Sequence, residues 1–236
     1  MPSNSYIIEV PNIGVVKVTK KSGQRSLRIR LTPKGDVLVS VPKLTPKVVT
    51  ERFIYSKRGW IIENRPNYNL NFYHGQKFKS GLILGLYEFQ PRNRSKLLAD
   101  RVNIYINGHY DHNNDKQKEY IEKSIIKAMK TKAENMLLPL LAEIAESTGH
   151  SFNQAYVKSL QSRWGSCDSN KNIILNIFML QLPLYLQKYV ILHELTHTRH
   201  MNHSEDFWNH LAKYLPNPKK YSRELKGYQT RIEESV

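Results

Sequence analysis

The first hundred residues alternate between apolar and polar side chains over short stretches, which glycine and proline separate. Residues 26–31 alternate strictly, which is typical of a strand with one buried face. Similar patterns predict further strands at residues 15–18, 37–41, 76–79, 82–90 and 102–106. A helix is expected over residues 45–64. Pro46 stands in its first turn, where a missing N–H does no harm. This part of the chain is therefore predicted to be rich in β-structure.

Beyond residue 115 the apolar positions recur at helical spacing. Residues 116–148 are predicted to form one long helix, which Pro139 kinks or divides and Gly149 ends. Strands at 156–160 and 173–180 are followed by helices at 184–200 and 204–214. An exposed connection at 109–115 predicts a domain boundary. We therefore expect an α+β protein with a β-rich domain at residues 1–112 and a second domain at residues 113–236.

The charge of the chain is uneven. The 236 residues carry a net charge of +16. Residues 1–100 contain 18 Lys and Arg against 6 Asp and Glu, whereas residues 101–236 contain 18 against 14. A basic front half can attract a nucleotide, a nucleic acid or an acidic protein surface, and a solvated basic surface explains the same excess equally well.

Other features restrict the class of protein. Cys167 is the single cysteine, so no intramolecular disulfide can form. No apolar run approaches the ~20 residues that a membrane span needs. The first 14 residues lack the basic start and apolar stretch of a secretory signal. We therefore expect a cytoplasmic protein without membrane association.

The strongest chemical signal is the HExxH motif at residues 193–197. His193 and His197 are four residues apart, so on a helix both imidazoles lie on one face and can bind the same Zn²⁺. Glu194 follows the first ligand and can reach a water molecule on the ion, which makes it the candidate general base. A solvent-exposed helix with two histidines is the alternative. Five of the nine histidines fall within residues 193–210, which favours the metal site.

A catalytic zinc site needs a third protein ligand. His203 lies six residues after His197, the spacing of the metzincin pattern HExxHxxGxxH, except that His200 occupies the glycine position. His203 can reach the ion if the helix ends after His200 and the chain turns back. His200 itself, or a glutamate at Glu205 or Glu224, is the competing ligand.

Several residues outside this motif have two possible roles. Arg163 either binds a carboxylate or phosphate of the substrate or belongs to a tight turn. Asn176 either holds the second nitrogen of a zinc ligand or simply packs. Cys167 is expected to be a small buried side chain rather than a nucleophile. Phe207 and Trp208 are expected in the core, with a substrate pocket as the alternative.

The order of these motifs resembles the YgjP-like metallopeptidase family, a zincin group related to the SprT-like and WLM peptidases. The segments that carry the resemblance are RWGSC at 163–167, ILN at 174–176, YVILHELTH at 189–197 and NHSEDFW at 202–208. The match covers about residues 115–228. It implies a zinc-dependent hydrolase with a gluzincin-like core, with His193, His197 and His203 as ligands and Glu194 as general base.

Three enzymatic functions remain open at this point. The first is a zinc metallopeptidase that acts on a protein or peptide substrate. The second is a metal-dependent phosphohydrolase of the nucleoside triphosphate pyrophosphatase type, which the basic front half and Arg163 would suit. The third is a DNA-associated protease of the SprT-like kind, tethered through the basic front half. A purely structural zinc site fits less well, because such sites are closed by four ligands.

Overall fold

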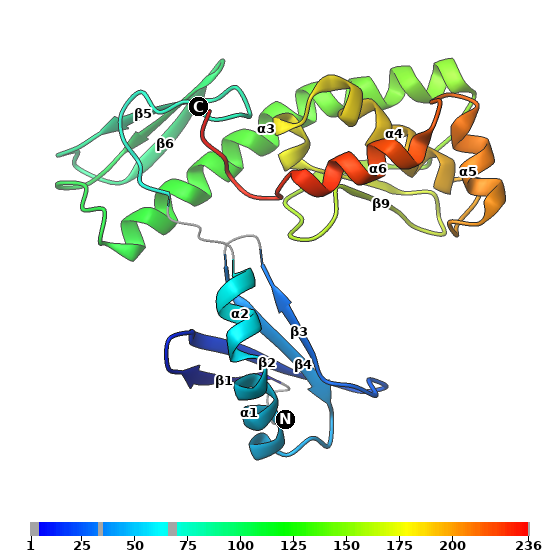
Figure 1. The fold of residues 1–236 in the computed structure, drawn as a ribbon. Coiled ribbons are helices and arrows are strands. Elements are labelled where there is room, and N and C mark those ends of the chain that lie inside the picture. The colour runs from blue at the N-terminus through cyan, green and yellow to red at the C-terminus, as the bar shows by residue number, and fades with distance from the viewer. Residues whose placement is uncertain (1–4, 33–34, 66–69, 236) are drawn as a thin grey trace. The chain divides into compact units, whose positions relative to one another are not determined.

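A computed structural model describes residues 5–32, 35–65 and 70–235 of the chain. The chain divides into two compact units, residues 1–70 and residues 71–236, which are described separately below (Figure 1). Both contain helices and strands, so the predicted α+β class is confirmed.

The first unit is built on a four-stranded sheet with the strand order β1-β2-β4-β3. Its strands are β1 (Ser5–Val10), β2 (Gly14–Lys21), β3 (Arg28–Leu31) and β4 (Val37–Pro42). β2 and β4 are parallel, and the other neighbours are antiparallel. Every second side chain of β2 and β4 is buried, and these valines pack with Ile54 and Ile61 from the two helices that follow.

The predicted helix at 45–64 is two helices, α1 (Lys47–Ser56) and α2 (Arg58–Asn64). They are separated at Lys57, whose backbone (φ −102°, ψ 6°) leaves the helical region. Pro46 is the N-cap residue rather than a residue of the first turn. Ile54 and Ile61, one on each helix, are buried in the same core.

The second unit begins with a three-stranded sheet in the order β5-β7-β6. Its strands are β5 (Ile83–Tyr87), β6 (Arg94–Leu98) and β7 (Arg101–Tyr105). The predicted strand at 76–79 is reduced to isolated bridges, one of which joins Phe78 to Glu234. The strand predicted at 82–90 ends before Phe89, whose positive φ of 55° is incompatible with an extended strand.

This sheet is joined to the far end of the chain. The Lys79 backbone N–H donates to the Glu233 carbonyl, and the Ser235 N–H donates to the Lys77 carbonyl. Lys132 of the following helix also donates to the carbonyl of Gly81. Because of these contacts the sheet belongs to the second unit, and the predicted boundary at 112/113 falls within that unit rather than at its edge.

The long helix α3 (Asp115–Thr148) is continuous through Pro139. The Asn114 side chain caps its first turn by accepting from the backbone N–H groups of Lys116 and Gln117. Gly149 ends it in the left-handed conformation, as predicted. The helix contacts β7, β8, η1 and α4, so it runs beside both halves of the second unit (Figure 1).

The remaining elements of the second unit surround α4. A sheet in the order β8-β10-β9 combines β8 (Ala155–Lys158), β9 (Gly165–Cys167) and β10 (Ile173–Asn176). The strand predicted at 173–180 stops at Asn176, which caps the 3₁₀ helix η1 (Ile177–Gln181). The helices that follow are α4 (Leu184–His197), α5 (Glu205–Ala212), α6 (Pro218–Glu224) and the 3₁₀ turn η2 (Leu225–Gly227). Across the described residues, none of the helices combines the length and the apolar character that crossing a membrane requires.

Candidate metal centre

The HExxH motif lies in the last turns of α4, the most buried helix of the second unit. Tyr189, Val190, Ile191, Leu192 and Leu195 are all buried and fix the helix against its neighbours. α4 ends at His197, three residues earlier than predicted, and the chain turns before Ser204 begins α5. This early end lets the chain reverse within a few residues.

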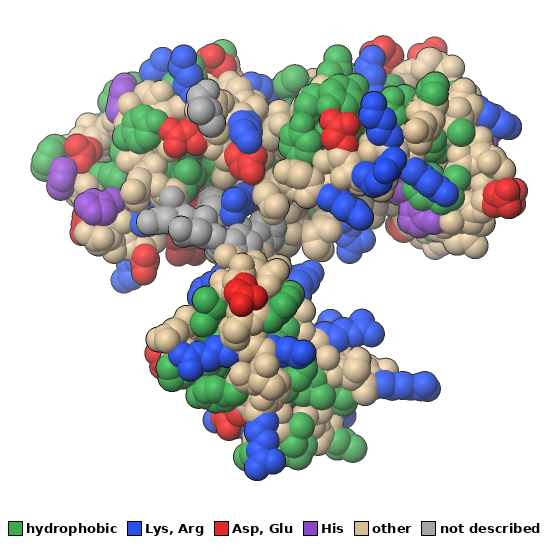
Figure 2. Space-filling model, in the orientation of Figure 1, with side chains coloured by type: hydrophobic (Ala, Val, Ile, Leu, Met, Phe, Trp, Pro, Cys, Tyr) green, Lys and Arg blue, Asp and Glu red, His purple; other side chains and the backbone are tan. Residues whose placement is uncertain are grey.

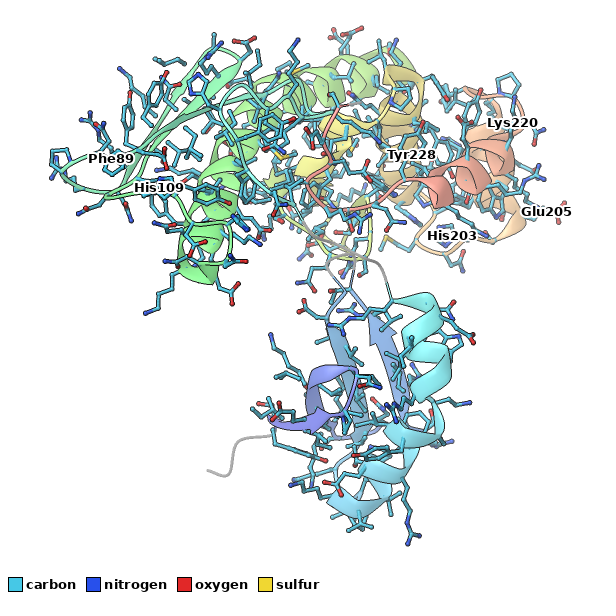
Figure 3. All side chains as sticks on the ribbon, turned by 60° about the vertical axis from the view of Figure 1, so that its left-hand side comes forward. Phe89, His109, His203, Glu205, Lys220 and Tyr228 are labelled. Carbon is cyan, nitrogen blue, oxygen red and sulfur yellow. The ribbon has the colours of Figure 1, made fainter. Side chains whose placement is uncertain are left out.

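The turn brings His203 back toward His193 and His197. One ligand nitrogen from each of the three imidazoles lies within 4.8 Å of the others. The Nε2 atoms of His193 and His203 are 3.0 Å apart. Two nitrogens bound to one tetrahedral Zn²⁺ at ~2.0–2.1 Å lie roughly 3.3 Å apart, so the spacing suits ligands of a shared ion. His203 stands on the turn that leads to Glu205 and α5 (Figure 3).

The His197 ring is held by the backbone of the same turn. Its Nδ1 lies 3.0 Å from the carbonyl oxygen of His200. A carbonyl only accepts, so Nδ1 carries the proton and Nε2 is left with its lone pair for a cation. His200 therefore acts through its main chain. Its ring lies beside His210 instead, with the two centroids 5.2 Å apart.

Phe207 forms the floor of the cluster. Its ring centroid is 4.9 Å from that of His193, 4.6 Å from that of His197 and 4.7 Å from that of His203. The side chain is fully buried. Phe207 was predicted in the core, but its contact with the three imidazoles was not predicted. Its position four residues after His203 could have indicated this contact, because that spacing places it one helical turn beyond His203.

The competing ligands lie outside this group. Among the described residues, the three imidazoles are the only cluster of potential ligands close enough to share an ion. Glu224 accepts a hydrogen bond from the Tyr185 hydroxyl. Glu205 is exposed in the first turn of α5, where a carboxylate favours the helix N-terminus.

Two of the three imidazoles, those of His193 and His197, are kept in the neutral form that binds metals. Burial, together with the proximity of His197 and His203, lowers the pKa of His193 to about 3. Burial also lowers the pKa of His197. Three imidazole nitrogens this close together are a donor set suited to Zn²⁺, so the residues fit the ion that the motif implies.

Glu194 lies beside the cluster and against the edge strand β9. Its side chain is buried, and this burial raises its pKa to about 8, while the charge of Arg163 acts in the opposite direction. A Cβ atom added to Gly165 would lie 2.7 Å from Glu194 Cγ and 2.8 Å from its Oε1. Glycine at this position is therefore what allows the carboxyl group to lie against the strand. A cation on the histidines would favour the ionised carboxylate.

Asn176 contacts the loop before β9 and not a histidine ligand. Its Nδ2 donates to the carbonyls of Leu160 (2.8 Å) and Arg163 (2.7 Å), and its Oδ1 accepts from the Phe178 N–H (3.2 Å). The side chain is fully buried, so these bonds hold the segment that ends at Arg163. Arg163 itself is exposed on the Glu194 side of β9.

Cys167 is the last residue of β9 and is partly exposed. Burial, with the Glu194 and Asp168 charges, raises the pKa of its thiol to about 11. At neutral pH the group is therefore a thiol and not a thiolate, which agrees with the expectation that it is no nucleophile.

Comparison with known proteins identifies the family. The model of the YgjP-like metallopeptidase domain matches residues 25–228, so the chain belongs to the YgjP-like family. The resemblance seen in the motifs is thereby confirmed, and the match extends well into the first unit. The chain is therefore a metallopeptidase of a metal-binding family. No curated protein matches the chain.

Part of the chain is similar to the crystal structure of the metallopeptidase zymogen of Pyrococcus abyssi abylysin, with 22% sequence identity and a TM-score of 0.35. The similarity covers 39% of this chain and 94% of that chain.

Proposed function

We propose that the protein is a zinc-dependent metallopeptidase in which His193, His197 and His203 hold the ion and Glu194 is the general base. The observation that carries the proposal is the convergence of three imidazoles on the turn after α4, with the buried carboxyl group of Glu194 next to the first of them in sequence. Membership of a metallopeptidase family supports a peptide substrate.

When bound, Zn²⁺ would act as a Lewis acid toward the scissile carbonyl and make water a better nucleophile at neutral pH. Glu194 takes the proton from the attacking water and passes it to the leaving amine, a transfer that contributes typically 10²–10⁴-fold to the rate. Phe207 and the His200 carbonyl hold the imidazoles in place. The exposed guanidinium of Arg163 is suited to bind a carbonyl or carboxylate of the substrate, and Asn176 fixes the loop that presents it.

The test is an activity panel on zinc-loaded full-length protein. The substrates are an unfolded protein, a set of quenched fluorescent peptides and the nucleoside triphosphates, with Glu194→Gln as the matched control. We expect peptide or protein cleavage that disappears in Glu194→Gln, while the zinc content stays at one ion per chain. Pyrophosphate release without peptide cleavage would instead assign the site to the phosphohydrolase predicted as an alternative.

Arg163 is tested in the same panel. Arg163→Ala is expected to raise the KM for peptides by about tenfold and to leave the zinc content unchanged, because its contribution is binding. Arg163→Lys should recover only part of the loss, since an ammonium cannot bind a planar group with two parallel hydrogen bonds. Unchanged kinetics in both variants would remove Arg163 from the site.

The cytoplasmic location of the protein stays a prediction.

A further inference from the structure

The sheet of the first unit has one face on the core and one face turned away from it. Side chains alternate between these faces along each strand. On β2, Val16 and Val18 are buried, whereas Lys17 and Lys21 between and beyond them are exposed. The helices α1 and α2 pack on the buried side through Ile54 and Ile61. Among the described residues of this unit, no helix packs on the opposite face.

Strand pairing sets basic side chains on both sides of this second face. Arg30 is paired with Leu38, Leu38 with Lys17, and Lys17 with Ile7. Arg30 and Lys17 are thus two strand spacings apart, roughly 9.6 Å. Arg28 lies two residues from Arg30 on β3 and points to the same side, at about 7 Å.

The strand between these cations, β4, contributes one apolar and one polar side chain to this face, Leu38 and Ser40. Arg28 is paired with Ser40, and Ser40 is paired with Thr19 on β2. Serine and threonine hydroxyls are common donors to phosphate oxygens, alongside Lys and Arg. We call the four cations Lys17, Lys21, Arg28 and Arg30, together with Leu38, Ser40 and Thr19, the basic face.

Acidic residues are scarce around the basic face. β2, β3 and β4 contain no Asp or Glu, and Glu9 lies on β1, the neighbour of β2, where it is paired with Val15. Residues 1–70 as a whole contain 13 Lys and Arg against 4 Asp and Glu, a net charge of +9. On the side of this unit seen in Figure 2, blue side chains (Lys and Arg) likewise outnumber red ones (Asp and Glu). The first unit thus holds most of the net charge of the chain.

We propose that the basic face binds the phosphate backbone of double-stranded DNA without reading its sequence. A duplex presents one negative charge per about 1.7 Å of its axis, which complements the cations of β2 and β3 on either side of β4. The outward side chains of β1–β4 include no aromatic ring, so the face lacks the stacking platforms typical of single-strand binding. The inference is independent of the proposed peptidase activity.

The experiment measures binding of full-length protein to a fluorescent 20-base-pair duplex by anisotropy at several salt concentrations. We expect wild-type binding in the micromolar range and a steep loss of affinity with salt, as four phosphate contacts require. The triple variant Lys17→Glu/Arg28→Glu/Arg30→Glu should bind at least tenfold more weakly. Its slope of log affinity against log salt should be shallower by about 2–3, since each phosphate contact contributes ~0.9.

The matched control carries the same change of charge on the helices, as Lys47→Glu/Arg52→Glu/Lys57→Glu. All three of these residues are exposed, and none lies on the sheet. The control should lose no more than about threefold in affinity. Equal losses in the two triple variants would overturn the proposal, because the effect would then follow net charge and not the basic face.

A second measurement avoids any dependence on folding of the variants. In wild-type protein, acylation of Lys17 and Lys21 should be slowed by the duplex, while acylation of Lys47 should not. Wild-type protein that fails to bind the duplex at low salt, prefers an RNA duplex, or binds only anionic phospholipid vesicles would overturn the assignment to DNA. Glu194→Gln should bind the duplex like wild type, which separates this result from failure of the peptidase proposal.

Discussion

Replacement of Gly165 by alanine tests the geometry at the general base most directly. The added methyl group would lie 2.7–2.9 Å from Cγ, Cδ and Oε1 of Glu194, whereas ordinary contacts begin at 3.4 Å. Gly165 does not adopt a positive φ, so alanine is compatible with its backbone. The three nearest atoms all belong to the Glu194 side chain, so either Glu194 or β9 has to move by roughly 0.7 Å.

The size of the effect follows from this displacement. Overpacking of this kind costs about 1–3 kcal/mol of unfolding free energy. Misplacing a catalytic group by about 1 Å lowers the rate by about 10²-fold. We therefore expect Gly165→Ala to reduce kcat by 10- to 100-fold. Zinc should be retained, because none of the three atoms nearest to the added carbon belongs to a histidine.

The assay combines peptide cleavage, zinc analysis and urea unfolding. Gly59→Ala is the matched control: it is a helical glycine with nothing within 4 Å of an added Cβ, and alanine there should stabilise by up to ~1 kcal/mol. In a Glu194→Asp background the shorter side chain relieves the clash, so Gly165→Ala should cost less stability than it does in wild type. Wild-type turnover in Gly165→Ala, or an undiminished cost in the aspartate background, would refute the reasoning.

Three further predictions concern the third metal ligand, the loop held by Asn176 and the buried His150. In competition with a chelator, His203→Ala should bind zinc at least 10²-fold more weakly than wild type. His200→Ala should keep its zinc, because only the main-chain carbonyl of His200 contacts a ligand, His197. Loss of zinc in both variants would contradict the ligand assignment. Asn176→Asp should lower the free energy of unfolding, measured with urea, by about 2–4 kcal/mol, because a carboxylate cannot donate to the carbonyls of Leu160 and Arg163. Wild-type stability in this variant would show that the loop does not depend on these two hydrogen bonds. Burial, followed by the charges of Arg199 and His210, lowers the pKa of His150 to about 4. As the pH falls, the unfolded chain is therefore protonated before the folded protein, and the free energy of unfolding should fall by about 3 kcal/mol between pH 6.5 and pH 4. A decrease of the same size in His150→Gln would show that another group causes it.

Much of the local structure could be predicted because it depends on neighbours in sequence. The long helix has its apolar positions and its terminal Gly149 within one continuous segment. Likewise, two imidazoles four residues apart on a helix share a face wherever that helix packs. These features follow from backbone geometry and need no knowledge of the rest of the fold.

Features that depend on distant segments escaped prediction. The contact between Gly165 and Glu194 joins residues 29 positions apart in sequence, and no local pattern announces it. The role of the His200 carbonyl depends on where α4 ends, which the side-chain pattern placed three residues too late. The short strands β1 and β6 were missed because half of the side chains of β1 and four of the five of β6 are exposed, so the apolar alternation in their sequences is weak.

The pairing of residues 77–79 with residues 233–235 determines the order in which the second unit can assemble. Its partners stand 154 positions apart, with every element of the candidate metal centre between them. Because closing so long a loop is slow, we expect this pairing to form late, after α3 and α4 have packed against each other. During synthesis, residues 77–79 leave the ribosome long before residues 233–235, so their backbone bonds to that segment can form only after it has emerged.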